Sequence, residues 1–268
     1  MNLADDLCAG LDPCIFAGSL GFTTPDPWQV KTLRGAGRRL LLNCARQSGK
    51  STTAAILALH RAVYYPESLV LLVSPSLRQS SELFRKVTHW MARLDVPPEL
   101  PEDNKLSCTF ANASRIVSLP SSEATIRGFS GASLIIEDEA SRVDDDLYRA
   151  VRPMLAVSNG ALILMSTPFG KRGHFFDEWT AMGTSAMGTS AMGTSDGGDV
   201  WERIEIRATE NPRITPEFLA EERRSMGDWW FKQEYLCQFV ETVNSVFSYD
   251  LVMAAIRPDI KPLFGGVQ

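Results

Sequence analysis

A short segment from Cys44 to Thr52 leaves this chain little freedom in how it folds. It reads Cys-Ala-Arg-Gln-Ser-Gly-Lys-Ser-Thr and lies between an apolar run and a helix-like stretch. In that context successive backbone N–H groups and a helix N-terminus form an anion site, the pattern called a P-loop. Gly49 lets the backbone approach a phosphate, Lys50 reaches the β and γ phosphates, and the Ser51 hydroxyl can ligate magnesium. Cys44 replaces the first glycine of the usual pattern, at a position that shapes the turn. We therefore expect MgATP to bind along these residues: Arg46, Gln47, Ser48, Gly49, Lys50, Ser51 and Thr52.

Short apolar runs alternate with helix-like stretches through the rest of the chain, which is typical of a parallel sheet with helices on both faces. The runs are short and apolar enough to be strands buried on both sides. We expect strands at Leu40–Asn43, Leu69–Ser74, Ile116–Leu119, Leu134–Asp138 and Ala161–Ser166. We expect helices at Lys50–Tyr64, Leu77–Leu94 and Asp146–Val157, and a loop rich in Pro and acid at Pro97–Asn104. The predicted fold class is α/β, in three layers with a mainly parallel central sheet.

A second apolar run, Leu-Ile-Ile, leads into three consecutive acids and suits the other half of a phosphate site. We predict that Asp138 and Ser51 hold the magnesium. Glu139 would orient and deprotonate the attacking water, and with Lys50 it would form the catalytic pair. The acid run leaves the register open, so Glu137 could be the residue on the metal side. Strand alternation would then turn Asp138 away, and we assign Glu137 a flanking role.

A third apolar run ends in Ser166, Thr167 and Pro168. Hydroxyl groups at the carboxyl end of a parallel strand face the ligand crevice, so Ser166 or Thr167 could sense the γ-phosphate. An ordinary exit from a strand into a turn would explain the same residues.

Composition limits which kinds of protein this can be. With 268 residues and 44% hydrophobic content, the chain can bury one large core. A net charge of −5 argues against coating nucleic acid through a general positive field. No apolar run approaches the roughly 18 residues of a membrane span, and Asp5 and Asp6 stand where a signal peptide needs positive charge. We therefore expect a soluble protein with no membrane partner.

The cysteines and histidines indicate no further site. The five cysteines form no CxxC pair, which argues against a zinc site or a disulfide framework. His60, His89 and His174 are isolated in the sequence. The first two fall in helical stretches, where a packed or solvated histidine is the usual role.

A repetitive segment differs from the rest of the chain. Ala181–Ser195 is three tandem copies of Ala-Met-Gly-Thr-Ser, followed by Asp-Gly-Gly-Asp. A five-residue period is too short for a solenoid, and small polar residues bury too little surface to offset their ordering entropy. We expect a flexible surface loop over 181–199.

Several motifs together resemble one family, the large terminase subunit of tailed bacteriophages, the ATPase that drives DNA into a procapsid. The resemblance covers nearly the whole chain. Its most specific pieces are Pro25–Gln29, Arg46–Ser51, Ser74–Ser80, the Asp138–Glu139 pair, Ser166–Lys171 and Trp229–Tyr235. It implies a P-loop NTPase of the RecA-like, ASCE type that hydrolyses ATP with Mg²⁺ as cofactor.

The resemblance also implies roles for individual residues. Trp28 and Gln29 look like the family's adenine-side motif, and Arg46 like its additional P-loop arginine. The hydroxyl pair at 166–167, and Thr167 above all, looks like the motif that couples hydrolysis to movement. Arg127, in a Gly-rich turn, resembles an arginine finger that completes a neighbour's site, which is worth about 10³ to 10⁵ in rate. A surface arginine is the competing interpretation.

The partners that the resemblance implies are double-stranded DNA, the portal protein, the small terminase subunit and other copies of this chain. Those copies would form a homo-oligomeric ring, taken as a pentamer, on the procapsid in the cytoplasm of a bacterial host. The basic residues that could contact DNA are Arg78, Arg85, Lys86, Lys171 and Arg172. For Arg85 and Lys86 a solvated helix face is the competing interpretation.

The chain departs from the family at its carboxyl end. Large terminases carry a second, nuclease domain, and the sequence stops at Gln268 with no room for one. We expect an ATPase domain over 1–240, with 1–37 as an adenine-side lead-in, then a linker over 241–268, and no DNA-cutting site. A motor ATPase is the favoured function. The alternative is a truncated module that binds its partners in a nucleotide-dependent way without productive turnover.

Overall fold

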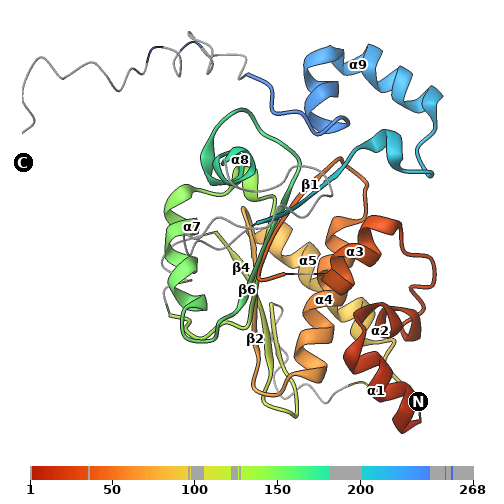
Figure 1. Ribbon diagram of the computed structural model, residues 1–268, viewed down its shortest axis with the longest axis vertical. Helices are drawn as coiled ribbons and strands as arrows, with labels where there is room; N and C mark the ends of the chain where they lie inside the picture. The colour runs from red at the N-terminus through yellow and green to blue at the C-terminus, as the bar shows by residue number, and fades with distance from the viewer. Residues whose placement is uncertain are drawn as a thin grey trace, which may run out of the picture.

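A seven-stranded sheet runs through the centre of the computed structural model (Figure 1). The structure describes residues 2–35, 37–95, 97, 106–121, 126, 128–181, 201–241, 251 and 255. The strands are β1 (Arg39–Cys44), β2 (Leu69–Ser74), β3 (Ser107–Thr109), β4 (Arg115–Pro120), β5 (Leu134–Asp138), β6 (Ala161–Ser166) and β7 (Glu202–Ile206). Their order is β3-β4-β2-β5-β6-β1-β7, and every pair is parallel except β3 with β4. The mainly parallel sheet expected from the sequence is confirmed.

The sequence predicts five of these strands and misses the two at the edges of the sheet. β3 has only three residues, too few to produce a recognisable pattern. β7 reads Glu-Arg-Ile-Glu-Ile, with charged residues between the apolar ones. An edge strand is only partly buried, so it does not need the continuous apolar run that marks the central strands.

The helices pack on both sides of this sheet. They are α1 (Leu3–Leu11), α2 (Pro13–Ser19), α3 (Pro27–Gly35), α4 (Lys50–Tyr64), α5 (Leu77–Met91), α7 (Asp145–Val151), α8 (Gly173–Thr180) and α9 (Pro216–Glu234), with the 3₁₀ turns η1 (Ala140–Arg142), η2 (Arg152–Leu155) and η3 (Ala208–Glu210). The first predicted helix is confirmed as α4. The second, α5, begins where expected because the Ser76 side chain caps it, and it ends at Met91. The predicted helix Asp146–Val157 is α7 followed by η2, because Pro153 has no N–H to continue the α-helical bonding.

Side chains alternate along each strand and build one core on each face of the sheet. The face beneath α4 and α5 includes Leu40, Leu42, Val70, Leu72, Leu134 and Ile136. The face beneath α7 and α8 includes Leu41, Leu71, Val73, Ile135, Leu162 and Leu164. Figure 1 shows these two pairs of helices on opposite sides of the strands. The same alternation turns Asp138 toward α4 and α5, and Glu137 toward α7 and α8.

Helix α9 lies beyond the carboxyl end of the sheet (Figure 1). It bends at Gly227, whose φ of 81° and ψ of 161° are outside the helical region. Its last turn packs on the P-loop through a third, small core that contains Ala45, Ala208, Leu219, Phe231, Tyr235 and Cys237. The Arg46 N–H also donates a hydrogen bond to the Glu234 carbonyl at 3.1 Å. Helix α9 is therefore tied directly to the start of the P-loop.

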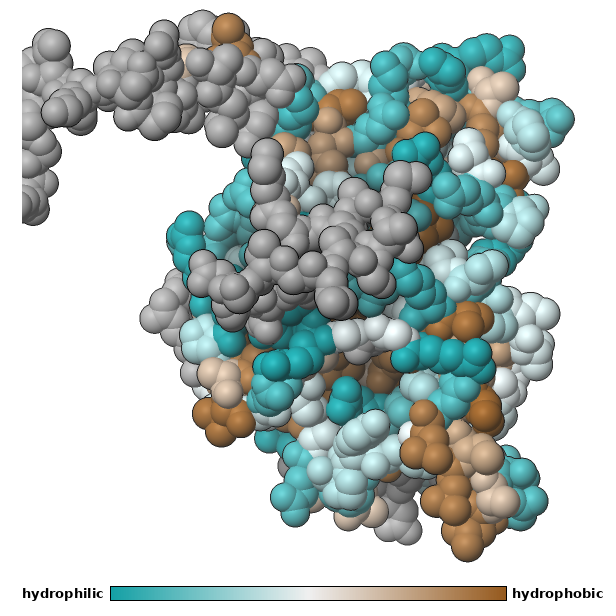
Figure 2. Space-filling view, in the orientation of Figure 1, coloured by the Kyte–Doolittle hydropathy of each residue, from teal (hydrophilic) through white to brown (hydrophobic). Residues whose placement is uncertain are grey.

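At the other end of the molecule, α1 leaves a stripe of apolar surface exposed, at the lower right of Figure 2. Leu3, Leu7 and Leu11 share one face of this helix because they are spaced four residues apart, and all three are exposed. None of the helices that the structure describes is both long and apolar enough to cross a membrane.

Some predicted segments fall wholly or mostly outside the described residues. They are the loop over 98–104, the repeat from 182 onward, and all of the linker over 241–268 except 241, 251 and 255. All five cysteines lie in the described part, as free thiols.

Candidate active site

The P-loop joins β1 to α4 at the carboxyl end of the sheet. Gly49 caps α4 with φ 92° and ψ 12°, a left-handed conformation that glycine adopts at little cost. A Cβ at this position would lie 3.0 Å from Nε2 of Gln29, so a side chain would also be crowded. Gln47 has a positive φ as well, 60°. The loop therefore turns sharply and presents the N-terminus of α4, which is a favourable place for an anion.

A cavity of about 600 Å³ opens over the P-loop. Its wall contains the whole predicted segment 46–52 together with Glu139 and Thr167. Three further residues line it that the sequence does not predict as part of the site: Gln79, Lys86 and Arg142. Lys86 is among the candidate DNA contacts in the sequence, and its position on α5 turns it into this cavity. The cavity is thus more basic than the P-loop alone would make it.

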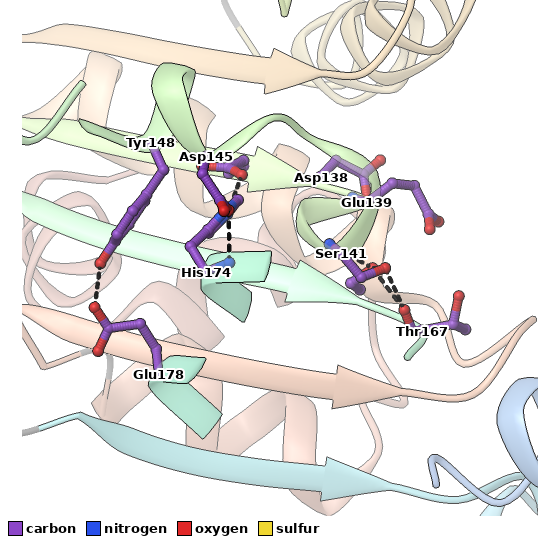
Figure 3. A network of polar contacts seen from close by, with 10 residues as sticks. Asp138, Glu139, Ser141, Asp145, Tyr148, Thr167, His174 and Glu178 are labelled. Atoms are coloured by element: carbon purple, nitrogen blue, oxygen red, sulfur yellow. Dashed lines mark hydrogen bonds and ion pairs between the residues drawn. The ribbon is translucent and has the colours of Figure 1, made fainter. Parts of the chain in front are cut away.

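The two predicted acids lie where β5 ends, beside this cavity (Figure 3). Lys50 Nζ lies 2.5 Å from Oε1 of Glu139. Glu139 has φ 55° and ψ 41°, a left-handed conformation that is uncommon outside glycine, and its N–H donates to Asp138 Oδ1 at 3.1 Å. Backbone strain of this kind gathers at functional sites, where the surrounding structure holds it in place.

The charges around Asp138 explain its protonation behaviour. Burial raises the pKa of Asp138 to about 6, while the charge of Lys50 lowers it and that of Glu139 raises it. Lys86 lowers it further from the α5 side. Burial disfavours the charge of Lys50, yet the carboxylates of Glu139 and Asp138 outweigh that effect and raise the pKa of Lys50. The nearby carboxylates thus favour the charge of Lys50, and the two lysines favour that of Asp138.

The predicted metal residues fit a magnesium ion that arrives with a phosphate. Mg²⁺ is usually bound by one or two carboxylates, several waters and substrate phosphates. Asp138 is a buried carboxylate that forms no ion pair with any described residue, and Ser51 supplies a hydroxyl on the cavity wall. Within the described ranges no group of three or more His, Cys, Asp or Glu could hold a metal by itself. The nucleotide would have to complete the coordination.

With this geometry in place, comparison with known proteins decides the family. Residues 41–252 match the family described as terminase large subunit, T4likevirus-type, N-terminal. The chain belongs to this family. The resemblance seen in the sequence is thus confirmed.

Among its relatives in the terminase family, the large subunit of Thermus virus P23-45 is 27% identical over 246 residues, which cover 84% of this chain and 50% of the relative. That of Escherichia phage T5 is 25% identical over 222 residues, covering 81% and 48%. The chain therefore spans about half the length of these relatives.

Solved terminase structures share the fold. The large terminase ATPase domain of Thermus phage P74-26 superposes with a TM-score of 0.72 at 22% identity, over 86% of this chain and 100% of that one. The large terminase of bacteriophage D6E in complex with ADP gives a TM-score of 0.59 at 10% identity, over 81% and 54%. At these identities the likeness shows the fold, a P-loop ATPase architecture.

The arginine and adenine-side residues of this terminase chain are held by other side chains. Arg46 lines the cavity, and its Nε lies 2.5 Å from Oε2 of Glu234 at the end of α9. Gln29 is buried; it accepts from the Asp26 N–H at 2.8 Å and its Nε2 donates to Thr53 Oγ1 at 3.1 Å. Trp28 packs against the core. Neither Trp28 nor Gln29 lines the cavity, so the geometry puts Gln29 behind the P-loop as a support.

The hydroxyl pair after β6 is joined to the turn that follows the acids. Ser141, in η1, has its Oγ 2.6 Å from Oγ of Ser166, and it donates to the Thr167 carbonyl at 2.7 Å (Figure 3). The Ser141 N–H also donates to Ser166 Oγ at 3.2 Å. Movement at the end of β6 would therefore reach the segment that carries Glu139. Arg127 lies outside the described residues.

Two residues have contacts that the sequence did not predict. His174 is isolated in the sequence, but in the fold its ring contacts Glu137 and Asp145. Glu137 lies on the face of β5 opposite Asp138, as strand alternation predicts, and it is fully buried against that ring. The one signal in the sequence was that Glu137 is an acid on the strand face opposite Asp138. A charge buried on that face needs a partner. Arg142 was also missed; it lies 3.6 Å from Glu234 and over the Phe169 ring.

Proposed function

We propose that this chain hydrolyses ATP as the motor part of a DNA-packaging terminase. The observation that carries the proposal is the 2.5 Å separation of Lys50 Nζ and Glu139 Oε1, on the wall of the phosphate cavity and beside the buried Asp138. Lys50 and Glu139 line one cavity and Asp138 directly precedes Glu139, so the groups that we propose for phosphate, water and metal lie close together. P-loop ATPases use these three groups together.

Binding of ATP would change the partner of Lys50. The lysine is paired with Glu139, and a triphosphate on the P-loop would offer it a larger negative charge. Glu139 would then be free to accept a proton from the attacking water. Asp138 and Ser51 would hold Mg²⁺, which supplies neutralisation of charge that develops on the phosphates. Gln47, Ser48, Gly49 and Thr52 would bind phosphate through the turn of the loop.

The motor part of the proposal is supported by family membership. We infer that the chain works with double-stranded DNA, a portal protein and a small terminase subunit in the host cytoplasm, as part of a homo-oligomeric ring. Arg127 would reach the cavity of a neighbouring copy, and the hydroxyls of Ser166 and Thr167 would pass movement to β6. Trp28 and Gln29 would mark the adenine side.

Phosphate release after ATP is added tests the proposal. We expect a turnover rate per chain that rises steeply with protein concentration, and an Arg127→Ala variant that binds nucleotide normally but loses turnover. Arg149→Ala is the matched control, because Arg149 is an exposed arginine that is paired with its neighbour Asp146. A rate independent of concentration would contradict the role of a neighbour's arginine. Nucleotide binding without any phosphate release would favour the alternative, a binding module.

A further inference from the structure

A cluster of ionisable side chains lies on the face of the sheet away from the phosphate cavity. It joins Glu137 of β5, His174 of α8 and Asp145 of α7. Figure 3 shows His174 and Asp145 beside each other. His174 Nε2 lies 2.7 Å from Glu137 Oε1, and Nδ1 lies 3.1 Å from Asp145 Oδ1. The side chains of His174 and Glu137 are 4% and 0% exposed. Burying a charged pair costs free energy. We therefore ask which elements the pair connects.

Each ring nitrogen of His174 faces a carboxyl oxygen, Nε2 that of Glu137 and Nδ1 that of Asp145. Burial disfavours charge on the ring, but the hydrogen bonds and charges of Glu137 and Asp145 outweigh that effect and raise the pKa of His174, which favours its charged form. The cluster therefore holds the His174 ring between two carboxyl groups, one of which is fully buried.

Further contacts fix the ring in place. The ring of Tyr148 stacks on it, with centroids 4.4 Å apart and planes at 8°. The Tyr148 hydroxyl donates to Glu178 Oε1 at 2.6 Å. The backbone N–H of His174 donates to Asp145 Oδ1 at 2.7 Å. The ring of His174 could not rotate without losing its contacts with Glu137, Asp145 and Tyr148. It is therefore a fixed point, an anchor, between α7 and α8.

The anchor acts on the segments that line the phosphate cavity. Glu137 directly precedes Asp138 and Glu139 on β5, so its side chain and theirs share one stretch of backbone. His174 lies in the first turn of α8, shortly after Thr167, which lines the cavity. The Ser141 hydroxyl ties the same two segments together at the carboxyl end of the sheet. The contact between Glu137 and His174 is thus a second connection between them.

We propose that Glu137 and His174 are positioning residues, whose ion pair fixes the end of β5 and so the placement of Asp138 and Glu139 relative to Thr167. Neither residue touches the cavity, and both act through the backbone of β5 and α8. The kinetic effect of the pair rests on the proposed ATPase function. Its effect on the position of β5 does not.

Glu137→Gln, His174→Gln and the double variant test this proposal. Asp146→Asn is the matched control, because it removes a carboxylate one residue from Asp145 that is 79% exposed. In ¹⁵N-labelled protein without nucleotide, we expect two protected ring N–H signals from His174, lost or shifted in Glu137→Gln. We expect the backbone amide signals of Glu139 and Thr167 to shift in both single variants and not in the control. Unshifted Glu139 and Thr167 signals would overturn the proposal.

Steady-state kinetics give the second measurement. We expect kcat to fall about tenfold in Glu137→Gln and in His174→Gln, with KM and the affinity for an ATP analogue within about twofold of wild type. The double variant should lose little more than either single one, because both remove the same pair. Unchanged kcat in folded variants, or losses that multiply, would overturn the positioning role.

If wild type shows no turnover while the amide signals shift, the ATPase proposal fails and the positioning role stands. If His174→Gln does not fold, Glu137→Gln, which keeps the shape of the side chain, decides.

Discussion

Two neighbouring carboxylates on β5 point to opposite faces of the sheet and differ in whether the protein supplies a cation for them. Glu137 points to the α7 and α8 face, where the protein supplies its cation as His174 at 2.7 Å. Asp138 points to the α4 and α5 face, where it is buried without an ion pair of its own in the described structure and where burial raises its pKa to about 6. The first carboxylate belongs to the fold. The second is the carboxylate that we propose as a ligand of Mg²⁺.

This difference separates a structural charge from a ligand site. A buried charge needs a partner, and where the chain does not provide one directly a ligand can. On the α4 face the basic groups Lys50 and Lys86 lie around a cavity and are available to phosphate. On the α8 face the ring of His174 fills the space beside Glu137. We therefore expect substitutions on the α4 face to change ligand binding and those on the α8 face to change the position of β5.

Removing the lysine of the P-loop should have the largest effect. We expect Lys50→Ala to lower ATP turnover about 10²- to 10³-fold, because Lys50 follows Gly49 in the P-loop, lines the cavity and is paired with Glu139 there. Lys232→Ala is the control, since Lys232 pairs with Asp228 on the surface of α9. Phosphate release measures both. Turnover within a few-fold of wild type in Lys50→Ala would contradict a phosphate site on the α4 face.

Neutralising each carboxylate in turn compares the two faces directly. We expect Asp138→Asn to raise the Mg²⁺ concentration needed for half-maximal turnover by about 10- to 100-fold. Glu137→Gln should shift that concentration much less even where it lowers kcat, because its partner is His174 and it acts on Asp138 only through the backbone of β5. A magnesium titration of each variant gives the answer. An equal shift in both would mean that Glu137 also serves the metal.

The effect of Lys86 should be smaller. Lys86 faces the cavity from α5 and forms no ion pair with any described residue, so its charge is available to a nucleotide. We expect Lys86→Ala to weaken ATP binding about fivefold, close to 1 kcal/mol. Arg85→Ala, which removes the neighbouring cation paired with Glu82, should change the affinity little. Nucleotide titration would contradict this if the two variants behaved alike.

The smallest effect concerns stability against pH. Burial lowers the pKa of His60 on the α4 face, although the carbonyls of Ala9 and Gly10 act against this. The unfolded chain then takes up the proton more readily, so stability held above about pH 6.5 is lost as the pH falls through the folded pKa. The raised pKa of His174 acts the other way: its contribution is complete below about pH 6.5 and is lost as the pH rises through the folded pKa.

Replacing His60 should therefore flatten the acid side of the stability curve. Urea unfolding of His60→Gln between pH 5 and 8 measures this, with the exposed His89→Gln as control. A slope equal to that of wild type would show that the α4 histidine carries no such coupling.

What the sequence could predict follows from how local each signal is. The P-loop and the β5 acids are contiguous patterns, and the central strands are unbroken apolar runs, so they could be placed without the fold. The pairs Glu137 with His174 and Arg46 with Glu234 are separated by 37 and 188 residues, and only the folded chain brings them together. Lys86 has the sequence environment of a solvated helix face, and only the packing of α5 against α4 turns it toward the P-loop.

Glutamate 139 gives the most direct test of the central claim, that the P-loop and the end of β5 form one ATP-hydrolysing site. Nucleotide affinity and phosphate release should be measured side by side on wild type and Glu139→Gln. The account predicts that Glu139→Gln binds ATP at least as well as wild type, since Lys50 loses its competing partner, and releases phosphate at least about 100-fold more slowly. Unchanged phosphate release in Glu139→Gln, or no nucleotide binding by wild type, would contradict it.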